Sequence, residues 1–509
     1  MDTFYKFTGN IDRRSPRNEG DFNSPYLREN WLSRNGRISK PRGTERAINT
    51  TLTATPTWAG RYYSIETGIV SPKSFCYTID GKIWLIDDIG RVASMVKDNL
   101  NVNARPQHQL FKVLNQTTMY LVDGQNLYKY DGNNDLIWEK VTLTDTDGNT
   151  INPIDIIEHQ DRLWLISETY IFVSKNLQPE VFNDATDSIQ IIIGSGKGKN
   201  LALGKIEDRL YILNTEGIFA VEGDTISAIA STFEVRKVDD RKIIAGGSAM
   251  LVEKAILFIA DDLELWSFDG NSTTLLSYNE KLKDFINPIR TFLDKMTACY
   301  YDNYYMLSFV ETGKTYNNLE VFWDAFENKI DFVRDRNISC YLTTDPTRET
   351  KYLQLGGSDD LGSGTYTIRW ADRSARFDGN TITSLLWTKD IIIKKGWNVR
   401  FRKFYPVFEP IGDNDITIQY WLDGRLSPPT GYTPSFTQRL QGETKTLGFI
   451  KIKNQNQATD GVSPKILLSR GESITFYIND STADLRCDFL GMGIDVILKA
   501  KKKRRIIGA

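Results

Sequence analysis

Residue types suited to acid–base or metal chemistry are scarce in this chain. The 509 residues include two histidines, His108 and His159, and neither has a Cys, Asp or Glu at a metal-ligand spacing. The four cysteines are far apart, without the paired spacing of a disulfide framework or a zinc knuckle. A catalytic triad or a histidine-based metal site therefore lacks the residues it needs. We expect no catalytic residue, no cofactor and no metal ion, and we expect buried thiols in a chain that folds in a reducing cytoplasm.

A glycine-rich loop at residues 194–200 resembles a phosphate-binding loop. Ile193 stands where the first glycine of that motif belongs, and Asn200 replaces the serine or threonine that would bind Mg²⁺. The default interpretation is a flexible basic loop. The alternative is that Lys197 and Lys199 face phosphates in a channel.

Acidic residues are numerous, but the sequence selects no catalytic pair. Residues 145–149 alternate acidic and small polar residues, yet they lack the register of an EF-hand and its bidentate glutamate. A glycosidase would use two carboxylates, for which Asp261 and Asp262 are examples. The Ser-x-Asp-x-Gly-x-Thr-Trp turn that is typical of sialidases is missing from the sequence.

The elements that would position these residues follow from a phrase repeated along the first three quarters of the chain. A short strand of aliphatic and aromatic residues is followed by a turn and a second strand. The phrase occurs at residues 83–86, 119–122, 163–166, 210–213, 256–259 and 304–307, at intervals of 36 to 48 residues. A recurrence of about 40–50 residues built from short strands predicts a β-propeller. We expect six to seven blades.

The segments between these phrases support hairpins. Partner strands are expected at residues 127–130, 171–174, 217–221, 265–268 and 319–323, and the turns are rich in Asp-Gly. One segment breaks this rhythm, because apolar residues recur at helical spacing between residues 279 and 296. Pro288 must end, kink or begin a helix there. We predict one short helical insertion that packs under the adjacent blade.

The chain divides into four regions of an all-β protein. Residues 1–50 have few periodic apolar positions and predict an extended N-terminal arm, which either wraps its own propeller or reaches another subunit. Residues 51–375 carry the propeller. Longer alternating strands predict an antiparallel β-sandwich over residues 376–498. Residues 499–509 form a basic C-terminal tail that either contacts DNA or an acidic partner, or serves as a solubilising tail.

The composition excludes several classes of protein. A formal net charge of −2 argues against a protein that binds nucleic acid over its whole surface, because such a protein carries an excess of basic residues. A nearly neutral channel surface along which DNA passes remains compatible with this charge. Aromatic residues at 12% and charged residues at 25% describe an ordered globular protein. The chain has neither a signal-peptide pattern at its start nor 18 consecutive uncharged apolar residues. We therefore expect no membrane association.

The order of these segments resembles the tail nozzle or tail-stabilising family of short-tailed bacteriophages. Residues 36–44 resemble an N-terminal phrase of the family. Residues 161–182 resemble one of its blades, and residues 207–221 resemble the repeat that follows. The similarity extends from residue 36 to about residue 375 and is weak in the sandwich. It lies in the order of the motifs rather than in any single motif.

This resemblance implies a structural virion protein without enzymatic activity, assembled in the host cytoplasm and located in the phage tail. Nozzle proteins form rings, commonly of six copies, whose lumen conducts DNA without sequence specificity. The implied partners are further copies in a hexameric ring, a tail adaptor or portal-side protein, and a tail fibre or needle. The candidate subunit or DNA contacts are Arg13, Arg14, Lys197, Lys199, Lys501, Lys502, Lys503, Arg504 and Arg505.

Two alternatives come from other functional classes. One is a propeller glycosidase or depolymerase that acts on cell-surface polysaccharide. The other is a glycan-binding receptor module of a virion, whose aromatic platforms would come from the eleven tryptophans. Burial of tryptophans between blades accounts for the same residues.

Overall fold

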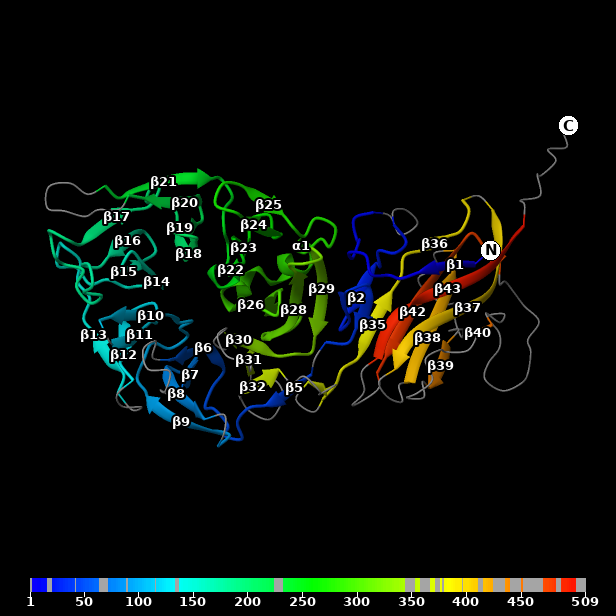
Figure 1. The fold of residues 1–509 in the computed structure, drawn as a ribbon, viewed down its shortest axis with the longest axis horizontal. Helices are drawn as coiled ribbons and strands as arrows, with labels where there is room; N and C mark the ends of the chain where they lie inside the picture. Colours follow the sequence, from blue (N-terminus) through cyan, green and yellow to red (C-terminus); the bar gives the residue numbers. More distant parts are fainter. Residues whose placement is uncertain are drawn as a thin grey trace.

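Short antiparallel strands form nearly all of the regular structure. The computed structural model describes residues 2–15, 21–41, 43–63, 72–87, 90–114, 116–132, 137–223, 232–343, 353–357, 367–370, 376–377, 380–395, 397–410, 415–423, 435–439, 450–451, 470–481 and 487–499. These residues form a β-propeller that is joined to an antiparallel β-sandwich (Figure 1). The predicted all-β architecture is confirmed.

The first five blades are separate sheets of four antiparallel strands, paired in sequence order. Blades 1 to 3 contain β6 (Pro56–Tyr62), β7 (Lys73–Thr78), β8 (Lys82–Asp87), β9 (Val92–Lys97); β10 (Gln107–Val113), β11 (Gln116–Val122), β12 (Leu127–Tyr130), β13 (Glu139–Val141); and β14 (Asp155–His159), β15 (Arg162–Ile166), β16 (Tyr170–Val173), β17 (Ile189–Ile192). Blades 4 and 5 contain β18 (Asn200–Ile206), β19 (Arg209–Asn214), β20 (Gly217–Glu222), β21 (Glu234–Asp239); and β22 (Met250–Val252), β23 (Ala255–Ile259), β24 (Leu265–Phe268), β25 (Thr273–Leu275).

Blades 6 and 7 belong to larger sheets. Blade 6 contains β26 (Thr297–Tyr301), β27 (Tyr304–Val310), β28 (Asn317–Asp324) and β29 (Lys329–Arg334). Blade 7 contains β30 (Ile338–Thr343), β31 (Leu353–Gly357), β32 (Thr367–Trp370) and, as its fourth strand, β5 (Thr44–Arg46) from near the N-terminus. Beyond β5, this sheet continues with β33 (Arg376–Phe377) and β34 (Asn380–Thr381).

The ring of blades is closed. The first strand of each blade contacts the first strand of the next, and β30 of blade 7 contacts β6 of blade 1. The described strands therefore form a propeller of seven blades, at the upper end of the predicted range. A strand from near the N-terminus completes blade 7, because β5 pairs antiparallel with β32 through Thr44 and Trp370.

The irregular first interval of the repeat has a local cause. In blades 2 to 6 the repeated phrase marks the second strand, but in blade 1 it marks the third strand, β8. Both middle strands of blade 1 are apolar and aromatic, so the sequence pattern does not distinguish them. The equivalent second strand is β7, and its Cys76 lies 44 residues before Tyr120 of blade 2.

The second strands carry the cores between blades. Every residue of β15 is buried, because neighbouring blades cover both of its faces. Trp164 in this strand is completely buried; its indole nitrogen donates to the His159 carbonyl at 2.9 Å, and its ring contacts the edge of Phe233. Such two-sided burial explains why these strands read as nearly continuous apolar runs.

The predicted helical insertion is present between blades 5 and 6. It consists of α1 (Lys283–Ile286) and the 3-10 segment η2 (Asn287–Lys295), with Pro288 in the first turn of η2. Ile286 and Ile289 are buried in the core that blades 5 and 6 share. A further short 3-10 turn, η1 (Gly246–Ser248), precedes blade 5. Among the described residues, no helix reaches the length and hydropathy of a membrane span.

The sandwich consists of two facing layers. One layer contains β1 (Asp2–Tyr5), β3 (Leu32–Arg34), β4 (Arg37–Ser39), β43 (Cys487–Lys499), β37 (Asn398–Pro410), β40 (Ile450–Lys451) and β41 (Arg470–Gly471). The other contains β35 (Ser384–Trp387), β36 (Ile391–Ile392), β38 (Asp415–Leu422), β39 (Ser435–Arg439) and β42 (Ser473–Asp480). Apolar side chains from both layers form one core.

Residues 1–50, expected as an extended arm, are an integral part of both domains. They provide β1, β3 and β4 to the sandwich and β5 to the propeller. Between these strands, β2 (Leu27–Glu29) lies where the two domains meet. Of the two alternatives for this segment, the described residues show the one in which it wraps its own chain.

Candidate functional site at the domain junction

Strand β2 makes one continuous sheet from blade 6 and the sandwich. It pairs in parallel with β29 through Glu29 and Phe332, and antiparallel with β35 through Leu27 and Trp387. The result is a ten-stranded sheet that runs from β26 of the propeller to β39 of the sandwich. The two domains therefore share backbone hydrogen bonds as well as side-chain contacts (Figure 1).

A buried ion pair lies under this strand. Arg28 of β2 pairs with Asp331 of β29, and both side chains are almost fully buried. The Arg28 guanidinium also donates to the carbonyls of Phe7 and Gly9, at 3.0 and 3.2 Å. Burial raises the pKa of Asp331, and the Arg28 charge opposes this rise. The pair thus holds residues 7–9 against blade 6.

Asn30 links the two domains directly. Its side-chain amide donates to the Thr383 carbonyl at 2.8 Å, and its side-chain oxygen accepts from the Arg334 backbone N–H at 2.7 Å. The Ser384 hydroxyl donates to the Asn30 carbonyl at 2.7 Å. Arg334 also pairs with Glu29 at 2.9 Å. One residue therefore bonds to β29, the last strand of blade 6, and to the start of β35 in the sandwich.

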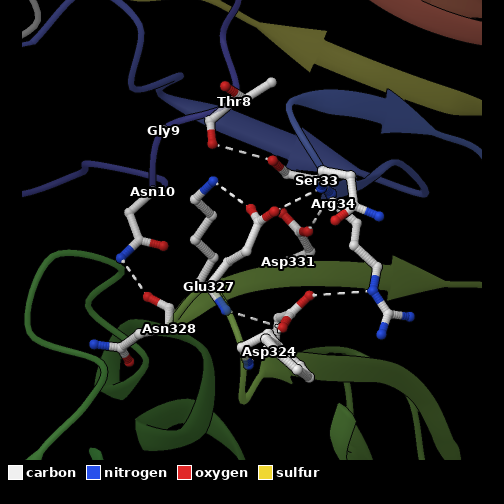
Figure 2. A network of polar contacts seen from close by, with 12 residues as sticks. Thr8, Gly9, Asn10, Ser33, Arg34, Asp324, Glu327, Asn328 and Asp331 are labelled. Carbon is white, nitrogen blue, oxygen red and sulfur yellow. Dashed lines mark hydrogen bonds and ion pairs between the residues drawn. The ribbon is translucent and has the colours of Figure 1, made fainter. Parts of the chain in front are cut away.

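Figure 2 shows how the outer hairpin of blade 6 is held by two N-terminal segments. The Asn10 amide donates to the Asn328 carbonyl at 3.2 Å. The Ser33 backbone N–H donates to Asp331 at 2.7 Å, and its hydroxyl donates to the Thr8 carbonyl at 3.0 Å. Both segments thereby fix the hairpin.

The sandwich side of the junction is equally polar beneath its surface. Lys40 and Asp480 form a fully buried ion pair, and Lys389 pairs with Asp12. Trp31 is completely buried and stacks on Phe489 in the sandwich core. Removing one partner of such a pair leaves the other charge buried without its counter-ion, which is unfavourable by about 3–5 kcal/mol. We call this polar region between the two domains the domain junction. It comprises residues 7–10, Asp12, Arg28, Glu29, Asn30, Trp31, Ser33, Lys40, Asn328, Asp331, Arg334, Thr383, Ser384, Lys389, Asp480 and Phe489.

The structure places Arg13 and Arg14 against their own chain. The Arg13 guanidinium lies 4.6 Å from the centre of the Phe285 ring in the helical insertion. Arg14 pairs with Glu264 at 3.2 Å and lies over the Tyr278 ring at 4.0 Å. These contacts fix the N-terminal segment on blade 5 and on the helical insertion.

The glycine-rich loop lies between blades 3 and 4 and binds a carboxylate of its own chain. Glu216 accepts from the Ser195 backbone N–H at 3.0 Å and from the Ser195 hydroxyl, and these bonds lower its pKa. Lys199 pairs with Glu168 at 2.8 Å, and Lys197 is exposed. A carboxylate held inside the loop disfavours a phosphate there.

The other sequence candidates are part of the blade architecture. Burial lowers the pKa of His108 and of His159 to about 4, so both are neutral at pH 7. Asp145 accepts from the backbone N–H groups of Asp147 and Asn149 within its own turn. Within the part of the chain that the structure describes, no cluster of three or more His, Cys, Asp or Glu is placed to hold a metal.

The acidic pair named as a glycosidase example shares one arginine as its ion-pair partner. Arg241 lies 3.7 Å from Asp261 and 3.5 Å from Asp262, and its guanidinium stacks on the Trp266 ring at 3.6 Å. Cys76, Cys299 and Cys340 are buried free thiols whose pKa values are raised by burial.

Comparisons with known proteins assign no family to this chain. No family model and no curated protein matches the sequence. Among solved structures, BBS1N in complex with ARL6DN is 11% identical, with a TM-score of 0.40 over 66% of this chain and 99% of that chain. YCF48 bound to D1 peptide is 12% identical, with a TM-score of 0.38 over 65% and 96%. BamB from Moraxella catarrhalis is 9% identical, with a TM-score of 0.37 over 67% and 93%.

The domain junction was not predicted from the sequence, and five of the predicted site residues cannot be compared with it. Lys501, Lys502, Lys503, Arg504 and Arg505 lie outside the described residues. For the junction, the available signal was the density of charged and amide residues between residues 28 and 40, in a segment without apolar periodicity. That signal indicates fixed polar contacts but does not identify the residues that make them.

Proposed function

We propose that this protein is a non-enzymatic structural component of a bacteriophage tail, one subunit of a ring-shaped nozzle or channel segment. DNA would pass through the ring without sequence-specific contacts. The order of the sequence motifs first pointed to this role. The observation that carries the proposal in the structure is strand β2, which joins blade 6 and the sandwich in one sheet.

A channel wall suits this architecture for a physical reason. Domains joined by a flexible linker move relative to one another, whereas a shared sheet and buried ion pairs oppose such motion. A propeller adds rigidity because each blade packs on its neighbours. A rigid body with two different ends can contact copies of itself at one surface and a second tail protein at another.

The partners follow from this role. We propose a ring of six copies in the virion tail, attached to a tail adaptor or portal-side protein and carrying a fibre or needle. The candidates for contact with a neighbour or with DNA are Lys197, Lys199 and the basic residues from Lys501 to Arg505, whereas Arg13 and Arg14 contact their own chain.

Mass photometry and negative-stain electron microscopy test the ring. The purified protein is measured alone and with the candidate tail adaptor, at low and at physiological salt. Closed rings of uniform copy number are the expected result. A monomer under every condition would contradict the proposal, and a variant shortened after Lys499 shows whether the basic tail is needed.

A further inference from the structure

A cavity of about 410 Å³ lies between blade 2 and the loop that follows β16 in blade 3. Its walls include Tyr120 and Lys129 from the middle strands of blade 2, Glu139 from the outer strand, and Glu180 from the blade 3 loop. Neither the domain junction nor the proposed ring accounts for this cavity.

The cavity is acidic. Three carboxylates line it, those of Asp131, Glu139 and Glu180, against the single ammonium of Lys129, which leaves a formal charge of −2. The Lys129 nitrogen lies 3.0 Å from Glu180 and 3.5 Å from Glu139, and the Tyr120 hydroxyl donates to Glu180 at 3.0 Å. Glu139 is 60% exposed, so its carboxylate is open to a further cation.

Apolar residues with unusual backbone geometry border the same cavity. Leu177 and Ile137 line it and are about half exposed, and Leu114, next to the lining residue Val113, is 87% exposed. Leu114 and Leu177 have φ values of 52° and 53°, in the left-handed region that bulky side chains rarely adopt. Strained, exposed residues of this kind concentrate at binding sites, where a contact compensates for their cost.

The chain contains one segment with the complementary chemistry. Residues 500–509 read AKKKRRIIGA, five consecutive cations followed by two isoleucines, and they lie outside the described residues. They follow β43, which lies in the sandwich at the opposite end of the molecule from blades 2 and 3 (Figure 1). Ten residues span at most about 36 Å when fully extended, which favours an occupant from another copy.

We propose that this cavity binds residues 500–509 of a second copy of the chain. Lysine and arginine side chains of that segment pair with Glu139, Asp131 and Glu180, and its isoleucines pack on Leu177 and Ile137. The contact is head-to-tail, so it generates a ring or a filament rather than a two-fold dimer. It deepens the proposed function by naming one subunit contact of the ring, but the binding step itself can be measured without a ring.

Fluorescence anisotropy with a labelled peptide of residues 499–509 tests the binding step. The peptide is titrated with the full-length protein and with the double variant Glu139→Gln/Glu180→Gln. We expect at least a tenfold weaker Kd for the double variant and weaker binding to the wild type as salt rises. Glu168→Gln is the matched control, because Glu168 is an exposed acid of blade 3, 64% exposed, whose ion-pair partner is Lys199. Equal affinity for a peptide with glutamine at all five cations would overturn the proposal.

A cysteine cross-link tests the contact between whole chains. Leu177→Cys in one copy and Ile506→Cys in another should form a disulfide-linked pair only when the two variants are mixed. Absence of that pair, with both variants folded, would also overturn the proposal. Rings that form without peptide binding would disprove this contact and leave the proposed function standing. Peptide binding and cross-linking without closed rings would support this contact and contradict the proposed ring.

Discussion

Lys40 and Asp480 lie with 3.0 Å between their charged atoms, and neither side chain has any exposed surface. Lys40 follows β4 near the N-terminus, whereas Asp480 ends β42 of the sandwich. The pair thus fixes the start of the chain to a strand that is synthesised near its end.

Replacing Lys40 by methionine should strongly destabilise the sandwich. The substitution leaves the Asp480 carboxylate buried without its cation, and we expect a loss of about 3–5 kcal/mol in the free energy of unfolding. Urea denaturation followed by tryptophan fluorescence measures it. Lys199→Met removes an exposed pair and should change stability by less than about 1 kcal/mol. Similar losses for the two variants would contradict the assignment of a buried ion pair.

Replacing Trp164 by alanine tests the core between blades. The ring is completely buried against Phe233, so its removal leaves a cavity, and we expect a loss of about 3–5 kcal/mol. Thermal unfolding monitored by circular dichroism gives the change. A melting temperature equal to that of the wild type would mean that this strand is not enclosed by its neighbours.

Glu280 predicts a pH dependence of stability. The residue is only 1% exposed, and burial, reinforced by the nearby charge of Glu264, raises the pKa of its carboxyl from 4.5 to about 8. The folded protein therefore keeps a proton that the unfolded chain releases above pH 4.5. This contribution to stability is complete below pH 4.5 and is lost as pH rises to about 8, by at most about 1.4 kcal/mol per pH unit.

The variant Glu280→Gln checks the origin of that slope. An amide of the same shape does not titrate, so stability measured by urea unfolding should fall less steeply between pH 5 and pH 8 than in the wild type. Identical slopes in the two proteins would show that another group is responsible.

Strand β5 predicts that the N-terminal region is needed for the propeller to close. Deletion of residues 2–46 removes the fourth strand of blade 7 as well as β2, and we expect a lower melting temperature and rapid proteolysis within residues 338–370. Hydrogen exchange provides the complementary measurement, because the backbone amides of β5 should be protected in the intact protein. A truncated chain with the stability of the full chain would show that these strands are dispensable.

Some parts of the fold were accessible from the sequence because local physics determines them. Residues 163–166 are buried on both faces, which forces a continuous apolar run that any blade of this kind must show. The partner strands and the helical insertion followed from the same periodicities, and each appears where it was predicted. The sequence did not show whether β7 or β8 is the second strand of blade 1, because both strands are apolar and aromatic. Their positions become clear only from the strands with which they pair.

Other parts depend on partners that are distant in the chain. The three residues of β5, Thr44, Glu45 and Arg46, have no strand pattern of their own and become a strand because blade 7 offers an open edge. Arg28 and Asp331 are separated by 303 residues, and the residues around a charged side chain do not indicate which distant residue it pairs with. For the same reason the sequence, which predicted Arg13 and Arg14 as subunit or DNA contacts, did not show that they contact Phe285 and Glu264 of their own chain.

The division of the first fifty residues between two domains has a consequence for biosynthesis. A ribosome makes β2 and β5 before it makes β29, β35 or β32, so neither early strand has a partner until more than 300 further residues have emerged. The nascent chain must keep these segments solvent-accessible and unaggregated throughout that interval. A contiguous segment of the chain therefore cannot be expressed as one complete domain, because the N-terminal strands of that domain would be missing.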